Sequence, residues 1–275
     1  MRRQRGWGSL RTAAVVIATV PFVYPFVFIA LTALKPATEF RTNKLGVPSS
    51  LTFAHLRSAW HRADLGSALV NSALVCTLGV AVLLVTTSLG AYWFLRNQNR
   101  MGRILLIVFI GAWALPVVTW IVPLFVLLSQ LGETNNLIVL GFAYGALNAP
   151  FGLYLFYTFF REGVPLEIIE AGEVDGASTF QQFRRIVLPV SAPAIATVAA
   201  LGFDWTWGEL LLAVSLIQTP GNWTVPIAAS TFTSFRSSDP QGQAAAALIA
   251  IIPVAALFLL AQRAIVRGMT AGVGK

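Results

Sequence analysis

The chain has 275 residues, of which 56% are hydrophobic and only 11% are charged, and its net charge is +8. Soluble domains carry about a quarter charged residues, so this composition argues against a water-soluble protein with a single core. No basic face on a soluble domain is visible either, so the positive charge does not indicate nucleic-acid binding. The composition is typical of a polytopic membrane protein.

The N-terminus, MRRQRGWGSLR, precedes an apolar run over residues 12–34. A cleaved signal peptide has a shorter apolar core and a small-residue cleavage site. We therefore expect an uncleaved first membrane helix.

Further apolar runs follow along the chain, each near the ~20 residues that cross a bilayer. They are continuous rather than alternating, and lipid offers no water to backbone groups, so we expect helices and not strands. The sequence predicts an all-α polytopic membrane protein, one transmembrane domain over residues 1–275, with spans at 12–34, 69–95, 104–128, 137–160, 191–217 and 243–265.

The basic residues are unequally distributed between the loops. An even number of spans puts both termini on one side, and 13 of the 19 Lys and Arg residues then fall on that side. The positive-inside rule places that side in the cytoplasm, together with both termini and the loop over 161–190. The longest loop on the opposite side, 35–68, is expected to be partly structured.

The sequence predicts no metal site. Cys76 is the single cysteine and lies in an apolar run, where we expect it to pack. His55 and His61 have no carboxylate cluster nearby in the sequence and are expected to be solvated.

The loop over 161–190 contains the stretch EAGEVDGASTFQQFRRIVLP, which is polar although long apolar runs flank it. Pro165 suits the first position of a helix, and 166–174 can follow as that helix. Its acidic residues Glu167, Glu170 and Glu173 recur every three positions and form a stripe on one face.

Turn and capping residues divide this loop into two short helices. Gly176 can adopt the left-handed conformation that ends the first helix. Ser178 and Thr179 are candidate N-caps of the second, with Gln181 or Gln182 completing a capping box. Plain connections in helical bundles are about 2–8 residues long, so a loop of this length with two helices is typical of a docking element.

The same stretch resembles the EAA loop of ABC importer permeases. Gly172 stands where that family usually has a second alanine, which should loosen the first helix by roughly 1 kcal/mol and keep the docking surface. The residues that carry the resemblance or its departure are Glu170, Ala171, Gly172, Asp175, Gly176, Ala177, Phe183, Ile186, Leu188 and Pro189.

Other segments agree with this resemblance over nearly the whole chain. They are Leu34-Lys35-Pro36 after the first span, Asn71-Ser72 at the second, Pro116 with the Ile-Val-Pro-Leu-Phe run over 121–125, and the Arg-Gly-Met-Thr-Ala-Gly ending over 267–272. The ending is similar to that of the carbohydrate-uptake branch, and the chain resembles the smaller membrane subunit of the maltose system. Trp207-Gly208-Glu209 departs from the Trp-Asn-Asp of many relatives.

The resemblance implies a permease that moves a sugar or sugar-like solute inward by alternating access. Its implied partners are a second homologous permease, two ATP-binding-cassette ATPase subunits, an extracytoplasmic solute-binding protein and the lipid of the inner membrane, with no nucleic acid. The loop over 161–190 would be the coupling loop that docks on the ATPase. ATP and Mg would belong to those partners, so no cofactor and no enzymatic activity are expected here. No Gly-rich phosphate loop ending in Lys-Ser/Thr occurs in the sequence.

Candidate residues of the translocation pathway lie in the fifth predicted span. A carboxylate such as Asp204 is costly at membrane depth, so it should face a cavity, the bundle interior or a partner. It could bind sugar hydroxyl groups beside Trp205 or Trp207, or form a structural hydrogen bond between subunits. On a regular helix Glu209 would lie about 140° from Asp204, so the two would not form one acid pair. We expect Trp113 and Trp120 to serve packing or the membrane interface.

Other functions remain open at this stage. The substrate could be an amino sugar, a glycerol phosphodiester or a polyol. An ion-driven secondary carrier would show inverted repeats and a midplane ion site, for which Asp204 alone is thin support. A membrane scaffold without transport would leave the coupling loop unexplained.

Overall fold

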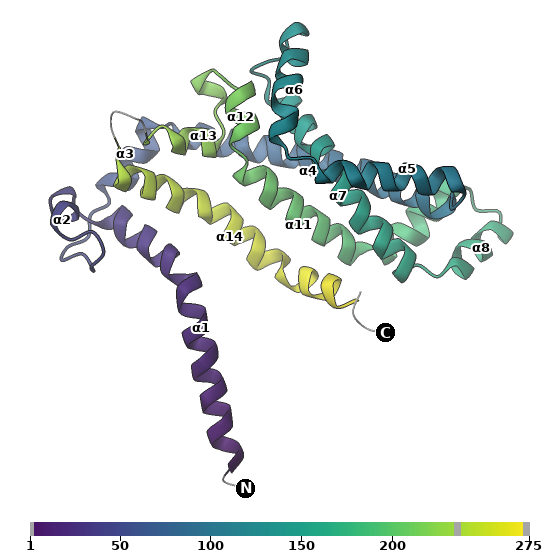
Figure 1. Cartoon of the computed structure of the whole chain (residues 1–275), viewed down its shortest axis with the longest axis horizontal. Helices are drawn as coiled ribbons and strands as arrows, with labels where there is room; N and C mark the ends of the chain where they lie inside the picture. Colours follow the sequence, from purple (N-terminus) through teal and green to yellow (C-terminus); the bar gives the residue numbers. More distant parts are fainter. Residues whose placement is uncertain (1–2, 234–237, 272–275) are drawn as a thin grey trace. The chain divides into compact units, whose positions relative to one another are not determined.

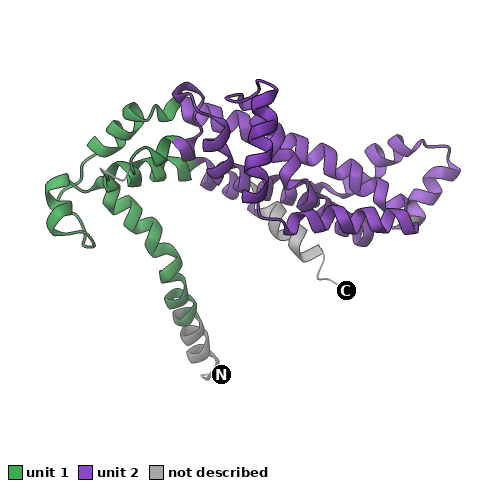
Figure 2. Cartoon of the chain, turned by 45° about the horizontal axis from the view of Figure 1, so that its top comes forward, with its two compact units in different colours: residues 1–66, 228–252 green, residues 67–227, 253–275 purple. Residues whose placement is uncertain are grey.

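The computed structural model describes residues 3–233 and 238–271. Two compact units are distinguished, one from residues 1–66 and 228–252 and the other from residues 67–227 and 253–275 (Figure 2). Arg2, Arg236 and Lys275, which entered the charge count, and Gly272 of the C-terminal motif lie outside the described residues.

The first unit is helical and contains the N-terminal membrane helix (Figure 1). Within α1 the apolar stretch Ala14–Leu34 is long enough to cross a bilayer. Its side chains are largely exposed, as contact with lipid requires. The helices are α1 (Arg3–Leu34), α2 (Ala37–Thr42), α3 (Ala54–Arg62) and residues 240–252 of α14 (Pro240–Ala271).

Two charged side chains fix the turn that follows α1. Lys35 is 1% exposed, and its Nζ donates to the backbone carbonyls of Asn43 at 2.7 Å and Gly46 at 2.6 Å. Glu39 accepts from the N–H and the hydroxyl of Ser49 at 2.9 and 2.8 Å. These bonds make part of the predicted loop 35–68 an ordered structure.

The second unit is the larger helical bundle. Its helices are α4 (Leu65–Arg96, from residue 67), α5 (Arg100–Gly111), the 3-10 turn η1 (Ala112–Ala114), α6 (Val118–Gln130), α7 (Leu137–Gly163), α8 (Leu166–Val174), α9 (Thr179–Gln182), the π-helical η2 (Phe183–Val187), α10 (Leu188–Val190), α11 (Ala192–Gly208), α12 (Leu211–Leu216), the 3-10 turn η3 (Pro220–Asn222), the start of α13 (Val225–Ser230) and residues 253–271 of α14.

Glycines let α4 and α7 approach closely. A Cβ on Gly145 would lie 2.6 Å from the Cβ of Val82, and one on Gly141 would lie 2.8 Å from the Cβ of Leu78. Small residues four positions apart are typical of tightly packed membrane helices. The two helices therefore pack closely along this stretch.

The predicted all-helical membrane architecture is confirmed. Four described helices are long and apolar enough to span a membrane, or six spans result if each of two bent helix pairs counts as one. The four lie in α1, α4, α7 and α14 and match the predicted first, second, fourth and sixth spans.

The predicted third span, 104–128, is not one continuous helix. The segments Arg100–Ala114 and Val118–Gln130 meet at 98°. Leu115 adopts extended backbone angles (φ −78°, ψ 125°), because the ring of the following Pro116 disfavours a helical conformation there. Apolar composition predicted the span but could not show this bend.

The predicted fifth span, 191–217, also needs correction. Its main helix α11 ends at Gly208, and Glu209 is extended (φ −74°, ψ 123°). A separate short helix, α12, follows. At its start, α11 is bent by 78° from the preceding helical segment Thr179–Val190. The assumption of a regular helix from Asp204 through Glu209 was therefore wrong.

Candidate functional site

The first helix of the coupling loop is α8, which has the bounds expected from the sequence, although Pro165 lies at its N-cap and not at its first helical position. Ile169 points into the core with 5% exposure. The opposite face carries Glu167, Glu170, Ala171 and Val174, all exposed. These positions share one helical stripe, so α8 presents a mixed acidic and apolar surface.

Gly176 ends α8 in the left-handed conformation that the sequence predicted, with φ +77°. The N–H of Ala177 donates to the carbonyl of Gly172 at 2.9 Å, and the N–H of Gly176 donates to that of Glu173 at 3.0 Å. This pair of bonds is a Schellman motif, which satisfies the last carbonyls of the helix. No atom lies within 4 Å of a Cβ built on Gly176, so only its backbone angle requires glycine.

The second helix begins with the predicted capping box, formed by Ser178 and Gln181. The Ser178 hydroxyl accepts from the N–H of Gln181 at 3.3 Å, and the Gln181 side chain accepts from the N–H of Ser178 at 2.8 Å. Both the turn and the cap are formed by residues that are close together in the sequence.

The structure divides the predicted docking residues into an outer and an inner group. The outer group is exposed or half-buried and comprises Glu170, Ala171, Asp175, Gly176, Ala177 and Pro189. Gly172 and Phe183 are buried, and Leu188 is half-buried beside them. A Cβ on Gly172 would lie 3.2 Å from Ile186 Cδ1 and 3.5 Å from Gln182 Cγ, so this glycine allows the second helix to pack closely on α8.

Gln182 holds the coupling loop against the end of α4, a contact that the sequence did not reveal. It is 1% exposed. Its Oε1 accepts from the Tyr92 hydroxyl at 3.0 Å and from Arg96 Nη1 at 2.8 Å, and its Nε2 donates to the Ala177 carbonyl at 3.1 Å. One buried amide thus joins α4, the turn after Gly176 and the second helix.

Two further contacts strengthen this attachment to α4. Arg96 forms an ion pair with Glu173, so Glu173 does not belong wholly to the acidic stripe predicted with Glu167 and Glu170. The rings of Tyr92 and Phe183 lie with their centroids 5.5 Å apart. Polar and aromatic contacts therefore bind the loop and α4 into one body.

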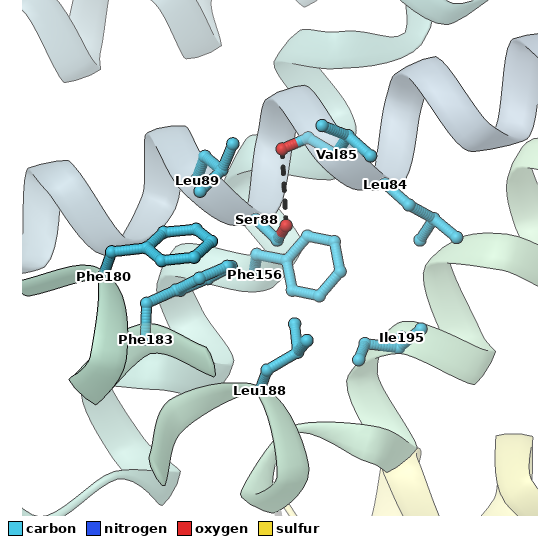
Figure 3. Close-up of a pocket in the computed structure, with 9 residues that line it drawn as sticks. All are labelled: Leu84, Val85, Ser88, Leu89, Phe156, Phe180, Phe183, Leu188 and Ile195. Atoms are coloured by element: carbon cyan, nitrogen blue, oxygen red, sulfur yellow. Dashed lines mark hydrogen bonds between the residues drawn. The ribbon is translucent and has the colours of Figure 1, made fainter. Parts of the chain in front are cut away.

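An apolar groove of about 360 Å³ runs beside the second helix of the coupling loop (Figure 3). Its single hydroxyl, on Ser88, donates to the carbonyl of Val85 at 3.4 Å. A groove without free polar groups does not suit a polyhydroxylated solute. The lining residues are Leu84, Val85, Ser88, Leu89, Phe156, Phe180, Phe183, Leu188 and Ile195.

Asp204 and Trp205 lie on the accessible side of α11. Asp204 is exposed, and its neighbour Trp205 is half-buried. The Trp205 ring meets Phe151 edge to face at 4.5 Å, and Phe151 lies 5.0 Å from Trp113. Trp113, expected to be a packing or interfacial residue, therefore extends an aromatic cluster that includes Trp205.

Trp207 and Glu209 occupy structural positions. Trp207 is 6% exposed, and its ring stacks on Phe203 with centroids 5.2 Å apart. Both Glu209 oxygens accept from the first turns of α12, and Tyr144 also donates to this carboxylate. The four residues predicted for the pathway thus separate into an accessible pair and a buried or capped pair.

Within residues 3–233 and 238–271, no group of three or more His, Cys, Asp and Glu side chains is arranged to hold a metal ion. His55 and His61 lie apart from the coupling loop in sequence and belong to the first unit.

The fold and the two-helix loop define the class of the protein: a multi-pass helical membrane protein with an ordered two-helix loop between two spans. A family model described as binding-protein-dependent transport system inner membrane component matches residues 83–271. The chain belongs to this family. It is a multi-pass inner membrane permease component, and ATP hydrolysis is the task of separate subunits.

Curated relatives match over essentially the full length. The trehalose transport system permease protein SugB of Mycobacterium tuberculosis is 32% identical, with 100% of this chain and 98% of the relative covered. The melibiose/raffinose/stachyose import permease protein MelC of Bacillus subtilis is 28% identical over 99% of this chain and 98% of the relative.

A solved structure shares the fold. It is a chain of a bacterial ABC transporter involved in the import of the acidic polysaccharide alginate, with a TM-score of 0.75 and 18% sequence identity. The match covers 96% of this chain and 98% of that chain. At this identity the likeness supports the fold and nothing finer.

Proposed function

We propose that the chain is the permease subunit of an ABC importer that moves a sugar or oligosaccharide into the cytoplasm by alternating access. The names of relatives support a carbohydrate: besides trehalose and melibiose, they include starch degradation products and diacetylchitobiose. Family membership decides against the ion-driven carrier and the scaffold. An amino sugar, a glycerol phosphodiester and a polyol stay as alternative substrates.

The observation that carries the proposal is the geometry of the coupling loop. The exposed face of α8 ends in a Schellman turn, and a capping box follows at once. An exposed helix of mixed acidic and apolar character fits a cleft on a partner protein, because apolar side chains such as Val174, 88% exposed, gain most from being covered. We assign ATPase docking to the outer group of the coupling loop. Gly172, Phe183 and Leu188 shape it from inside.

The orientation follows from the charge distribution. The excess of basic residues on the side of the coupling loop supports a cytoplasmic location for that loop and for both termini. The loop after α1 and the segment between α12 and α14 then face the extracytoplasmic side, where a solute-binding protein would approach. Family membership implies ATPase and binding-protein partners in general, and we assign two ATPase subunits and a second homologous permease as the finer composition.

We assign Asp204 and Trp205 to the translocation pathway. A carboxylate exposed on a membrane helix must face water or a partner subunit and not lipid. Beside it, the partly accessible Trp205 offers an aromatic face to the apolar side of a sugar ring. We assign Trp207 and Glu209 to structural roles in the packing and capping of α11 and α12.

The test of ATPase docking uses substitutions that change one property of the coupling loop at a time. Gly176→Ala adds a side chain that clashes with nothing but resists the positive φ, at a cost of roughly 1–2 kcal/mol. Gly163→Ala is the matched control, since its Cβ also meets nothing within 4 Å and no positive φ is involved. Glu170→Lys reverses one exposed charge and leaves the fold intact.

We expect Gly176→Ala and Glu170→Lys to insert normally and to pair with the second permease, but to lose ATPase co-purification or binding-protein-stimulated ATP turnover. Gly163→Ala should behave as the unaltered chain. Full ATPase recovery with normal stimulated turnover in both loop variants would refute the docking assignment.

A further inference from the structure

The coupling loop is attached to α4 as well as to its covalent neighbours α7 and α11. Gln182 accepts hydrogen bonds from Tyr92 and Arg96 of α4, and Arg96 also pairs with Glu173. Because Gln182 is buried, it cannot belong to the docking surface itself. Its bonds instead tie that surface to the last turn of a membrane helix.

The opposite end of α4 makes a second set of long-range hydrogen bonds. Asn71 Nδ2 donates to the carbonyls of Gly221 at 2.9 Å and Trp223 at 3.0 Å. The buried hydroxyl of Ser72 accepts from the N–H of Val225 at 2.8 Å. The segment 221–225 is therefore held by α4, and these bonds account for the Asn-Ser pair at the start of the predicted second span.

Between these two attachments α4 is uninterrupted. Within its 32 residues, the stretch from Asn71 to Arg96 corresponds to about 38 Å of helix. Of the four described helices that can span a membrane unbroken, α4 alone has no internal proline, whereas α1, α7 and α14 contain Pro21 and Pro25, Pro150 and Pro253 respectively. Proline removes a backbone hydrogen bond and favours kinks, so α4 lacks the cause of kinking that the other three helices contain.

From this arrangement we infer that α4 transmits movement of the coupling loop to the extracytoplasmic segment 221–225. The helix is attached to the coupling loop through Gln182 and to the segment through Asn71 and Ser72. The inference rests on the proposed function, because it takes the coupling loop as the ATPase contact and segment 221–225 as lying on the binding-protein side. It adds that Gln182, Tyr92 and Asn71 are positioning residues for coupling, with no contact to ATP or solute.

A second connection between the outer segment and the coupling loop is formed by α7 and the turn before it, and this connection supplies the matched control. The turn before α7 also holds the outer segment, since Asn135 Oδ1 accepts from the N–H groups of Gln218 at 3.2 Å and Thr219 at 3.0 Å. This route reaches the coupling loop through the covalent chain and does not pass through Gln182. A change at Asn135 should therefore be independent of a change at Gln182, whereas a change at Asn71 should not.

The experiment is a double-mutant cycle in the complete transporter in lipid nanodiscs, with its ATPase and binding protein. Gln182→Met removes the side-chain hydrogen bonds and keeps the side-chain length. Asn71→Ala removes the bonds to Gly221 and Trp223 with a good helix former, while the bond between Ser72 and Val225 is kept. We expect each to lower binding-protein-stimulated ATP turnover about fivefold or more, while ATPase co-purification is kept. The double variant should lose little more than the more severe single variant, because both changes act on the same connection.

Controls separate this effect from simple destabilisation. Asn135→Gly accepts the native φ of +61° and removes the side-chain hydrogen bonds to Gln218 and Thr219. Its fold-loss of stimulated ATP turnover should multiply with that of Gln182→Met, as the effects of independent sites do. Gln182→Glu keeps the acceptor for Tyr92 and Arg96 and should restore coupling. If Gln182→Met does not assemble, Tyr92→Phe replaces it, because the ring stays against Phe183 and only the hydroxyl is lost.

The inference would be overturned if the double variant of Asn71→Ala and Gln182→Met lost stimulated ATP turnover by the product of the two single losses. Normal stimulated turnover in either single variant would also overturn it. Loss of ATPase co-purification in Gln182→Met or Tyr92→Phe would also overturn it, since the residue would then act in docking. A failure of the unaltered chain to co-purify with the ATPase would instead refute the proposed function.

Discussion

The hydroxyl of Tyr144 on α7 donates a 2.6 Å hydrogen bond to Oε2 of Glu209, in the break between α11 and α12. The same carboxylate accepts from the N–H groups of Leu212 at 2.9 Å and Ala213 at 3.1 Å. It therefore caps α12 and anchors the break to α7. A carboxylate with these partners has little capacity left for a solute.

Removal of this cap should destabilise the permease. We expect Glu209→Ala to lower the free energy of unfolding by about 1–3 kcal/mol, because it leaves the N–H groups at the start of α12 without a partner. Glu209→Gln should cost less, since its amide oxygen can still accept one of these bonds. Thermal unfolding in nanodiscs measures the difference, and equal stability of the alanine variant and the unaltered chain would refute the capping role.

The charge of Asp204 should matter to transport and not to assembly. Asp204→Asn keeps the shape of the side chain and removes the charge, so we expect normal assembly with uptake reduced about tenfold, as for the loss of a charged hydrogen bond. Uptake into proteoliposomes measures this, alongside ATP turnover. Unchanged uptake together with unchanged turnover would leave Asp204 with a structural role only.

Both termini should be inaccessible from outside the cell. Arg2→Cys and Lys275→Cys, made in a Cys76→Ala background, should resist a membrane-impermeant thiol reagent in intact cells and react after permeabilisation. A cysteine in the loop after α1, such as Ser50→Cys, should react in intact cells and serves as the control. Efficient labelling of either terminus from outside would reverse the proposed orientation.

The loop after α1 should loosen in acid. Hydrogen bonds from the hydroxyl and N–H of Ser49 lower the pKa of Glu39 below its usual value. A lowered folded-state pKa means that this contribution is fully present above the unfolded pKa of about 4.3 and is lost as the pH falls through the folded pKa. We expect acid-enhanced proteolysis of the loop in the native chain and pH-independent cleavage between pH 3 and pH 7 in Glu39→Gln. Identical pH profiles for the two chains would contradict this assignment.

Local sequence determined the membrane class and the shape of the coupling loop. The apolar runs predicted a helical membrane protein, because hydropathy sums over neighbouring residues. The bounds of α8, the positive φ of Gly176 and the Ser178–Gln181 capping box were also predictable, since each depends on residues within one or two helical turns. The family resemblance of that loop agrees with the match over residues 83–271.

Only the tertiary structure showed which polar side chains form hydrogen bonds within the protein and with which partners. Gln182 binds partners 86 and 90 residues away, and Glu209 binds Tyr144 65 residues away. Hydropathy and spacing contain no information about such pairs, so Glu209 was assigned to the pathway and Gln182 only to a cap. The sequence alone thus predicts a membrane permease with a polar two-helix loop. Packing determines that the buried amide of Gln182, with the Arg96–Glu173 ion pair, attaches this loop to α4, because a buried polar group must find its hydrogen-bond partner wherever the fold brings one.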